Sequence, residues 1–136
     1  MADNVEEKKK SVKETIGNYG KEPNVNSPIQ SVYFDFNQVV LSEDDKITLD
    51  KVIRSLKNNP NSTVTMIGFT DNIGTKEVNV RVASARARAT RAYLTANGIS
   101  KKRVTIYGYG EVMFKGDNAT AQGRALNRRV EIEINL

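Results

Sequence analysis

The order in which hydrophobic periodicity changes along the chain restricts its fold more than any other feature. Residues 31–36 and 129–134 alternate apolar and polar side chains, which is the pattern of strands with one buried face. Residues 63–68 and 104–107 are short apolar segments that we also predict to be strands. Apolar residues recur at helical spacing across 42–58 and again across 75–97. The predicted order is therefore β-α-β-α-β-β.

Local signals mark the ends of both helices. Ser42, followed three residues later by Asp45, predicts a capping box at the start of the first helix. Asn58-Asn59-Pro60 ends that helix, and Gly98 ends the second. We expect the second helix to bury a face of small residues and so to lie close to its neighbour. The residues of that face are Val78, Val82, Ala85, Ala89, Ala92 and Ala96. A loop over 108–119 and about one helical turn over 120–127 precede the last strand.

This order of elements, over about 105 residues, predicts an α+β fold. We expect a two-layer sandwich in which one sheet carries two helices on a single face. Each β-α-β link is expected to join parallel strands through a right-handed crossover. Organised sequence begins near residue 29, so the predicted domain is 29–136. Residues 1–28 contain few large apolar residues and are predicted to form a flexible polar linker.

Composition removes most familiar enzyme chemistry. The chain contains no cysteine and no histidine, which excludes disulfides, thiolate nucleophiles, imidazole bases and Ser-His-Asp triads. No run approaches the ~18 apolar residues of a membrane helix. Residues 1–20 lack the apolar core of a signal peptide, so the protein is either cytosolic or a piece whose signal lies upstream. We expect a binding protein without a cofactor and not an enzyme.

Positive charge is concentrated in one part of the sequence. The net charge is +5, and all of it lies beyond residue 28. Seven basic residues and no acidic residue lie between Glu77 and Glu111: Arg81, Arg86, Arg88, Arg91, Lys101, Lys102 and Arg103. They form either a solvated face or a surface for an anionic partner such as nucleic acid, lipid or a carboxylate polymer. Against nucleic acid, Arg81, Arg88 and Arg91 are expected to point in different directions, and no aromatic stacking motif accompanies them.

Three chemical sites have little support. The glycines form neither a dinucleotide-binding nor a Walker loop. Glu43-Asp44-Asp45 is acidic, but it lies at a predicted helix start, where carboxylates favour the dipole, so we predict no metal site there. An enzyme that used Asp71 or Glu111 as an acid would need a second carboxylate opposite it, and no spacing in the sequence indicates one.

Asp71 and Arg86 are the most informative pair. Asp71 follows a predicted strand directly, at the edge of the sheet where open α/β sheets bind ligands. Arg86 lies four residues after Val82, near the packed side of the next helix. A carboxylate and a guanidinium facing one cleft would hold a zwitterion, with the guanidinium gripping a carboxylate and Asp71 accepting from an ammonium. The alternative is a salt bridge between Asp71 and Arg86 without a ligand.

The sequence around this pair resembles the signature of the OmpA-like peptidoglycan-binding domain. Four segments carry the resemblance in the right order and extend over about residues 31–134. They are 32–37, 68–74 with Asn79 and Ala83-Ser84-Ala85-Arg86-Ala87, 108–111 with Asn118-Ala119-Thr120, and 123–132 with its Asn-Arg-Arg-Val-Glu-Ile end. Phe69 stands where a histidine is usual, Val82-Ala83 where Leu-Ser is usual, and Phe114 near a usual proline.

The resemblance implies a mixed four-stranded sheet and a non-enzymatic module that grips the cell wall of Gram-negative bacteria in the periplasm. It implies that Asp71 and Arg86 bind the diaminopimelate of the stem peptide of peptidoglycan. It also implies supporting positions at Asn37, Thr70, Asn79 and Arg128. Such a module would anchor the outer membrane or a membrane complex, through an upstream part that tethers it to the outer membrane.

Overall fold

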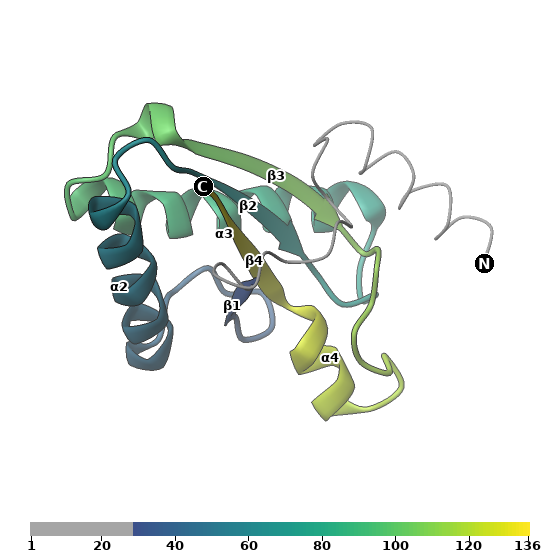
Figure 1. Cartoon of the computed structure of the whole chain (residues 1–136). Helices are drawn as coiled ribbons and strands as arrows, with labels where there is room; N and C mark the ends of the chain where they lie inside the picture. The colour runs from purple at the N-terminus through teal and green to yellow at the C-terminus, as the bar shows by residue number, and fades with distance from the viewer. Residues whose placement is uncertain (1–28) are drawn as a thin grey trace.

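The computed structural model describes residues 29–136, and the predicted linker over 1–28 lies outside the described residues. The chain forms an α+β fold with a mixed four-stranded sheet, as predicted (Figure 1). The elements are β1 (Gln30–Tyr33), α2 (Glu43–Asn58), β2 (Thr63–Phe69), α3 (Lys76–Ala96), the 3-10 turn η1 (Lys101–Arg103), β3 (Val104–Gly110), α4 (Ala121–Asn127) and β4 (Arg129–Asn135).

The strand order β1-β4-β2-β3 brings three chain segments to one edge of the sheet. β2 and β3 are parallel and joined through α3, whereas β4 lies between β1 and β2 and is antiparallel to both. Arg129, the first residue of β4, pairs with the last residues of β1 and β2, Tyr33 and Phe69. The loop after β1, the loop after β2 and the residue before β4 therefore meet at this edge.

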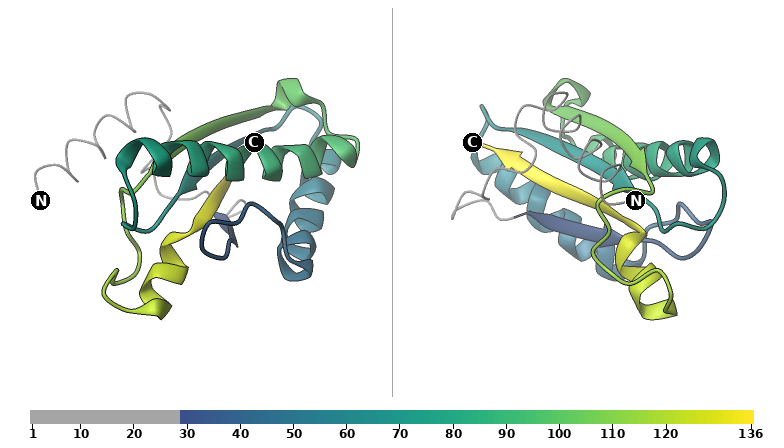
Figure 2. Two further views of the ribbon diagram at one scale, coloured as in Figure 1. Left: turned by 180° about the vertical axis from the view of Figure 1, so that it is seen from behind. Right: turned by 90° about the vertical axis from the view of Figure 1, so that its right-hand side faces the viewer.

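The helices α2 and α3 lie on the same side of the sheet (Figure 2). The main core between these layers is apolar and includes Val32, Leu49, Val64, Leu94 and Ile132, each with no exposed surface. Burying such side chains contributes about 1.5–3 kcal/mol each. Among residues 29–136, no helix is long and apolar enough to span a bilayer.

Glycines in the sheet let α3 lie close to it. A Cβ atom built at Gly68 would lie 2.1 Å from the carbonyl oxygen of Ala83, and one at Gly108 would lie 2.1 Å from Ser84 Oγ. Neither position has room for a side chain, so the predicted close approach of this helix is confirmed. It depends on the glycines of the strands as well as on the small residues of the helix.

The predicted buried face of α3 is wrong. Val78 is 39% exposed, and Ala92 and Ala96 are also exposed. The buried residues are Asn79, Ala83, Arg86, Ala87, Thr90 and Leu94. Three of these six are polar, and a search for apolar periodicity places polar residues outside. The helix is therefore rotated from the expected orientation so that polar groups face inward.

The predicted capping box at the start of α2 is confirmed. Ser42 Oγ accepts a hydrogen bond from the Asp45 amide at 3.1 Å, and the Asp45 carboxylate accepts from the Ser42 amide at 3.2 Å. The same carboxylate accepts from the Tyr33 amide at 3.1 Å, which ties the helix to β1. The acidic group at 43–45 thus serves the helix start, and Glu43 pairs with Lys46.

The first strand is shorter than predicted. β1 ends at Tyr33, and the chain turns over 35–38, where the Gln38 amide donates to the Asp35 carbonyl at 3.0 Å. Asn37 adopts a left-handed φ of 59° in this turn, which asparagine tolerates better than most residues. Phe36 is consequently 54% exposed, although its place in the alternating pattern predicted burial.

Candidate functional site

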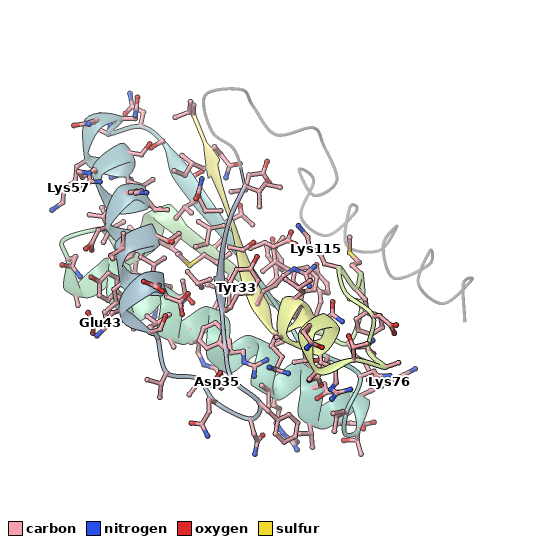
Figure 3. All side chains as sticks on the ribbon, turned by 90° about the horizontal axis from the view of Figure 1, so that it is seen from below. Tyr33, Asp35, Glu43, Lys57, Lys76 and Lys115 are labelled. Carbon is pink, nitrogen blue, oxygen red and sulfur yellow. The ribbon has the colours of Figure 1, made fainter. Side chains whose placement is uncertain are left out.

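A cleft of about 110 Å³ opens at the sheet edge where the three segments meet. All six residues that the sequence and its resemblance assigned to a binding site line it: Asn37, Thr70, Asp71, Asn79, Arg86 and Arg128. Phe36, Ile73, Gly74, Val78 and Val82 complete the lining. In Figure 3, Asp35 lies at the lower end of β1, where the chain turns, and Tyr33 lies farther up the strand.

Asp71 lies on the floor of the cleft with only 3% of its surface exposed. Its Oδ1 accepts from the amide of Ile73 at 3.1 Å, which holds the loop after β2. Its Oδ2 accepts from Nη1 of Arg128 at 3.2 Å, and Nε of Arg128 donates to the Phe34 carbonyl at 2.8 Å. The alternative of a salt bridge between Asp71 and Arg86 is therefore wrong, because the ion-pair partner of Asp71 is Arg128.

Arg86 is 1% exposed and donates to backbone carbonyls of the turn after β1 and of the last residue of β2. Its Nε donates to Gln38 at 3.0 Å, its Nη2 to Asp35 at 3.1 Å and its Nη1 to Phe69 at 3.4 Å. The guanidinium also lies 5.3 Å from the centre of the Phe34 ring. One side chain of α3 thus joins the turn after β1 to the end of β2.

The charges lining the cleft do not balance. Two guanidiniums, Arg86 and Arg128, face one carboxylate, Asp71, so the lining carries a net charge of +1. Burial, the largest cause, and repulsion from Arg128 together lower the pKa of Arg86 to about 10, although attraction to Asp71 opposes both effects. Arg86 stays charged at neutral pH, and an additional anion in the cleft would stabilise it.

Asn79 contributes a buried donor without a partner. The residue is 5% exposed, and its Nδ2 forms no hydrogen bond in the part of the chain that the structure describes. Native proteins rarely leave such a group unpaired, because its desolvation costs about 1–3 kcal/mol. Thr70 is different, since its hydroxyl donates to the carbonyl of Asp71 at 2.9 Å. The Asn79 amide therefore has a donor that an acceptor from a ligand or from water would satisfy.

Apolar side chains surround the mouth of the cleft. Phe36 is 54% exposed, Ile73 45% and Val78 39%, and each comes from a different segment. No sequence pattern had assigned these residues to the site. Their exposure beside a charged floor suits a ligand with a polar end and an apolar arm.

Of the departures from the usual family pattern, one, Val82, lies in the cleft lining. Phe69 is fully buried, its ring lies 4.1 Å below the guanidinium of Arg129, and it is not among the lining residues. Phe114 and Glu111 also lie outside the lining. Only Val82 contributes a side chain there, whereas Ala83 packs against Gly68.

The fold and cleft define a two-layer α+β domain with a buried, cationic polar site at one sheet edge. The sequence model of the OmpA family matches residues 33–128, and the chain belongs to this family. Outer membrane protein A of Bordetella avium is 38% identical over 102 residues, covering 75% of this chain and 53% of that protein. Peptidoglycan-binding protein ArfA of Mycobacterium tuberculosis is 40% identical over 87 residues, covering 64% and 27%.

Solved structures give the same result. The peptidoglycan-associated lipoprotein from Burkholderia pseudomallei superimposes with a TM-score of 0.75 at 26% identity, covering 78% of this chain and 90% of that one. The cell wall anchor of the type VI secretion system (T6SS) from Pseudomonas aeruginosa has a TM-score of 0.66 at 26% identity, covering 79% and 80%. The chain spans about half the length of the Bordetella protein and about a quarter of the mycobacterial one.

Proposed function

We propose that this domain binds peptidoglycan non-covalently by holding the free amino-acid end of a diaminopimelate residue in the stem peptide. The observation that carries the proposal is the cleft itself, whose charged residues are largely buried and whose lining carries a net charge of +1. Membership of the OmpA family and the names of two similar proteins, a peptidoglycan-binding protein and a peptidoglycan-associated lipoprotein, support the choice of polymer.

The free end of diaminopimelate carries one carboxylate and one ammonium. The carboxylate is expected to bind Arg86 and the Asn79 amide, which satisfies the unpaired donor and balances the charge of the cleft. Arg86 has five N–H groups, of which three bind backbone carbonyls, so two remain for a ligand. The ammonium would donate to Asp71, whose oxygens each accept one protein hydrogen bond and retain further capacity.

The apolar rim completes this assignment. Phe36, Ile73 and Val78 would pack against the aliphatic arm that links the amino-acid end to the rest of the stem. Each charge-assisted contact contributes about 1.5–3 kcal/mol, so one stem should bind with modest affinity. Firm attachment would require many copies on one polymer or membrane. We therefore assign the domain a periplasmic anchoring role, connecting the outer membrane or a membrane complex to the wall.

The experiment is co-sedimentation with purified insoluble peptidoglycan. Asp71→Asn removes the charge that pairs with the ammonium while keeping nearly the same shape, and we expect about 10-fold or greater loss of binding. Asp44→Asn is the matched control, because Asp44 is exposed and lies outside this cleft. Circular dichroism and thermal melts check that both variants are folded.

Two results would contradict the proposal. The first is a wild-type protein that stays in the supernatant, and the second is a folded Asp71→Asn variant that sediments as well as the wild type. The wall recovered after binding should have unchanged composition, because the proposed function includes no reaction. Release of soluble fragments would instead favour an enzyme.

A further inference from the structure

Three arginines follow the outer side of α3, apart from the buried guanidinium of the cleft. Arg81 and Arg88 are exposed and Arg91 is half-buried. Seven residues of an α-helix return to within about 20° of the starting direction, so Arg81 and Arg88 share one face. The sequence-based expectation that these arginines point in different directions is therefore wrong for this pair. We call Arg81, Arg88 and Arg91 the basic stripe.

No carboxylate neutralises the basic stripe. Two of the seven basic residues between Glu77 and Glu111 bind backbone carbonyls: Arg86, and Arg103, which donates to Leu56, Asn59 and Ser62. The other five are the three arginines of the stripe together with Lys101 and Lys102 in η1, which follows α3. Within residues 29–136, none of these five forms an ion pair, although Glu77 lies one turn from Arg81.

The basic stripe begins beside the mouth of the cleft. Val78 forms part of the apolar rim and precedes Arg81 by three residues, so their side chains are neighbours on the helix surface. With a rise of 1.5 Å per residue, Arg88 and Arg91 lie about 10 and 15 Å farther along the helix than Arg81. A polymer that leaves the cleft over Val78 would meet these arginines in order.

We propose that the basic stripe is a second contact for the wall polymer, which binds ionised carboxylates of stem peptides adjacent to the one held in the cleft. This inference rests on the proposed function, because it takes the polymer to be peptidoglycan. Guanidinium groups match carboxylates in shape and charge. Each exposed pair contributes little alone, so the stripe acts by adding weak contacts to a polymer already held at the cleft.

The test separates the stripe from the cleft by the size of the ligand. The variant Arg81→Gln/Arg88→Gln/Arg91→Gln is compared with Lys51→Gln/Arg54→Gln/Lys57→Gln, which removes three positive charges from exposed positions of α2. Both are titrated with a soluble diaminopimelate tetrapeptide and sedimented with intact peptidoglycan. We expect tetrapeptide affinity within about twofold of wild type for both, and about tenfold weaker wall binding for the stripe variant alone at low salt.

Salt provides a second measurement. The Debye screening length falls from about 10 Å at 0.1 M salt to about 3 Å at 1 M salt. The difference in wall binding between the wild type and the stripe variant should therefore shrink as salt is added. The proposal would be overturned if the stripe variant bound the wall as tightly as the wild type at low salt. It would also be overturned if the α2 control lost as much wall binding as the stripe variant. In both cases, tetrapeptide binding would still support the proposed function of the cleft. A wild type that binds neither tetrapeptide nor wall would refute the proposed function as well.

Two further probes test other anionic partners. Vesicles containing anionic phospholipid and duplex DNA are offered to the same three proteins at the same salt. Binding to either probe that depends on the stripe, without stripe-dependent binding to the wall, would assign the stripe to lipid or nucleic acid and overturn our assignment. Stripe-dependent binding to the wall alone would support it.

Discussion

Arg86 is expected to stabilise the fold as well as to bind ligand, and Arg86→Lys tests this double role. Lysine keeps the positive charge but not the planar fork that reaches Asp35, Gln38 and Phe69 together. If the ammonium keeps one of the three hydrogen bonds, two carbonyls lose their donor. Water can replace part of this loss at the exposed turn. We therefore expect a cost of about 2–4 kcal/mol in unfolding free energy.

Urea denaturation and thermal melts measure this cost. For a domain of this size, the loss corresponds to a fall in Tm of about 10–20 °C. Arg88→Lys is the matched control, because Arg88 lies exposed on the same helix and should change stability by less than about 0.5 kcal/mol. Faster amide exchange at Asn37 and Gln38 in the Arg86→Lys variant would show that the turn after β1 has loosened. An Arg86→Lys protein as stable as the Arg88→Lys control would refute the structural role.

The remaining predictions concern packing, capping and ionisation. Gly68→Ala should destabilise the fold by about 1–3 kcal/mol in urea denaturation, because its methyl group would collide with the Ala83 carbonyl; unchanged stability would contradict this packing. Asp45→Ala should lower the unfolding free energy by about 1–2 kcal/mol in the same assay and speed amide exchange at Tyr33. Unchanged stability and exchange would show that the cap is dispensable. The hydrogen bond from Tyr93 to Asp50 raises the pKa of Tyr93 above its usual value of 10.0. The stability that this bond contributes is therefore present below pH 10 and is lost as the pH rises through the raised pKa. An NMR titration of the Asp50→Asn variant should show a lower Tyr93 pKa than in the wild type, and an unchanged pKa would contradict the assigned cause.

Sequence patterns predicted the elements of this fold well, because strand and helix periods differ and the helix ends carry local signals. The position of β4 in the sheet is the feature that hydrophobic periodicity could not predict. Alternation over 129–134 identifies a strand but does not say which strands it pairs with. The resemblance to the OmpA-like domain implied the mixed sheet, and the structure confirms it.

The sequence and its resemblance named six residues that line the cleft, but they did not predict which of these residues pair with one another. Spacing along the chain indicated that Asp71 and Arg86 would face one cleft, and both line it. The ion pair forms instead between Asp71 and Arg128, which are separated by 57 positions and meet only because β4 inserts beside β2. The hydrogen bonds from Arg86 to the carbonyls of Asp35 and Gln38 depend on the turn after β1, and the sequence had predicted a strand through part of that turn.

Polar residues on the buried side of α3 caused the largest error. Asn79 and Thr90 occupy positions that a hydrophobic pattern assigns to solvent, whereas Arg86 was expected near the packed side of the helix. They are buried because two of them line a polar cleft and Thr90 donates to the carbonyl of Arg86. The polar residues on one side of α3 therefore indicated the site, whereas the spacing of the alanines predicted the wrong buried face.

The measurement that tests the central claim most directly is calorimetric titration of the wild-type protein with three stem tetrapeptides. One contains diaminopimelate, one contains diaminopimelate with its free carboxylate amidated, and one contains lysine, which lacks that carboxylate. The charge imbalance of the cleft and the unpaired Asn79 amide predict that the first binds most tightly. Loss of the carboxylate charge should weaken binding about 10-fold or more, with lysine weakest because it also lacks an acceptor for Asn79. Equal affinity for all three peptides would contradict the account.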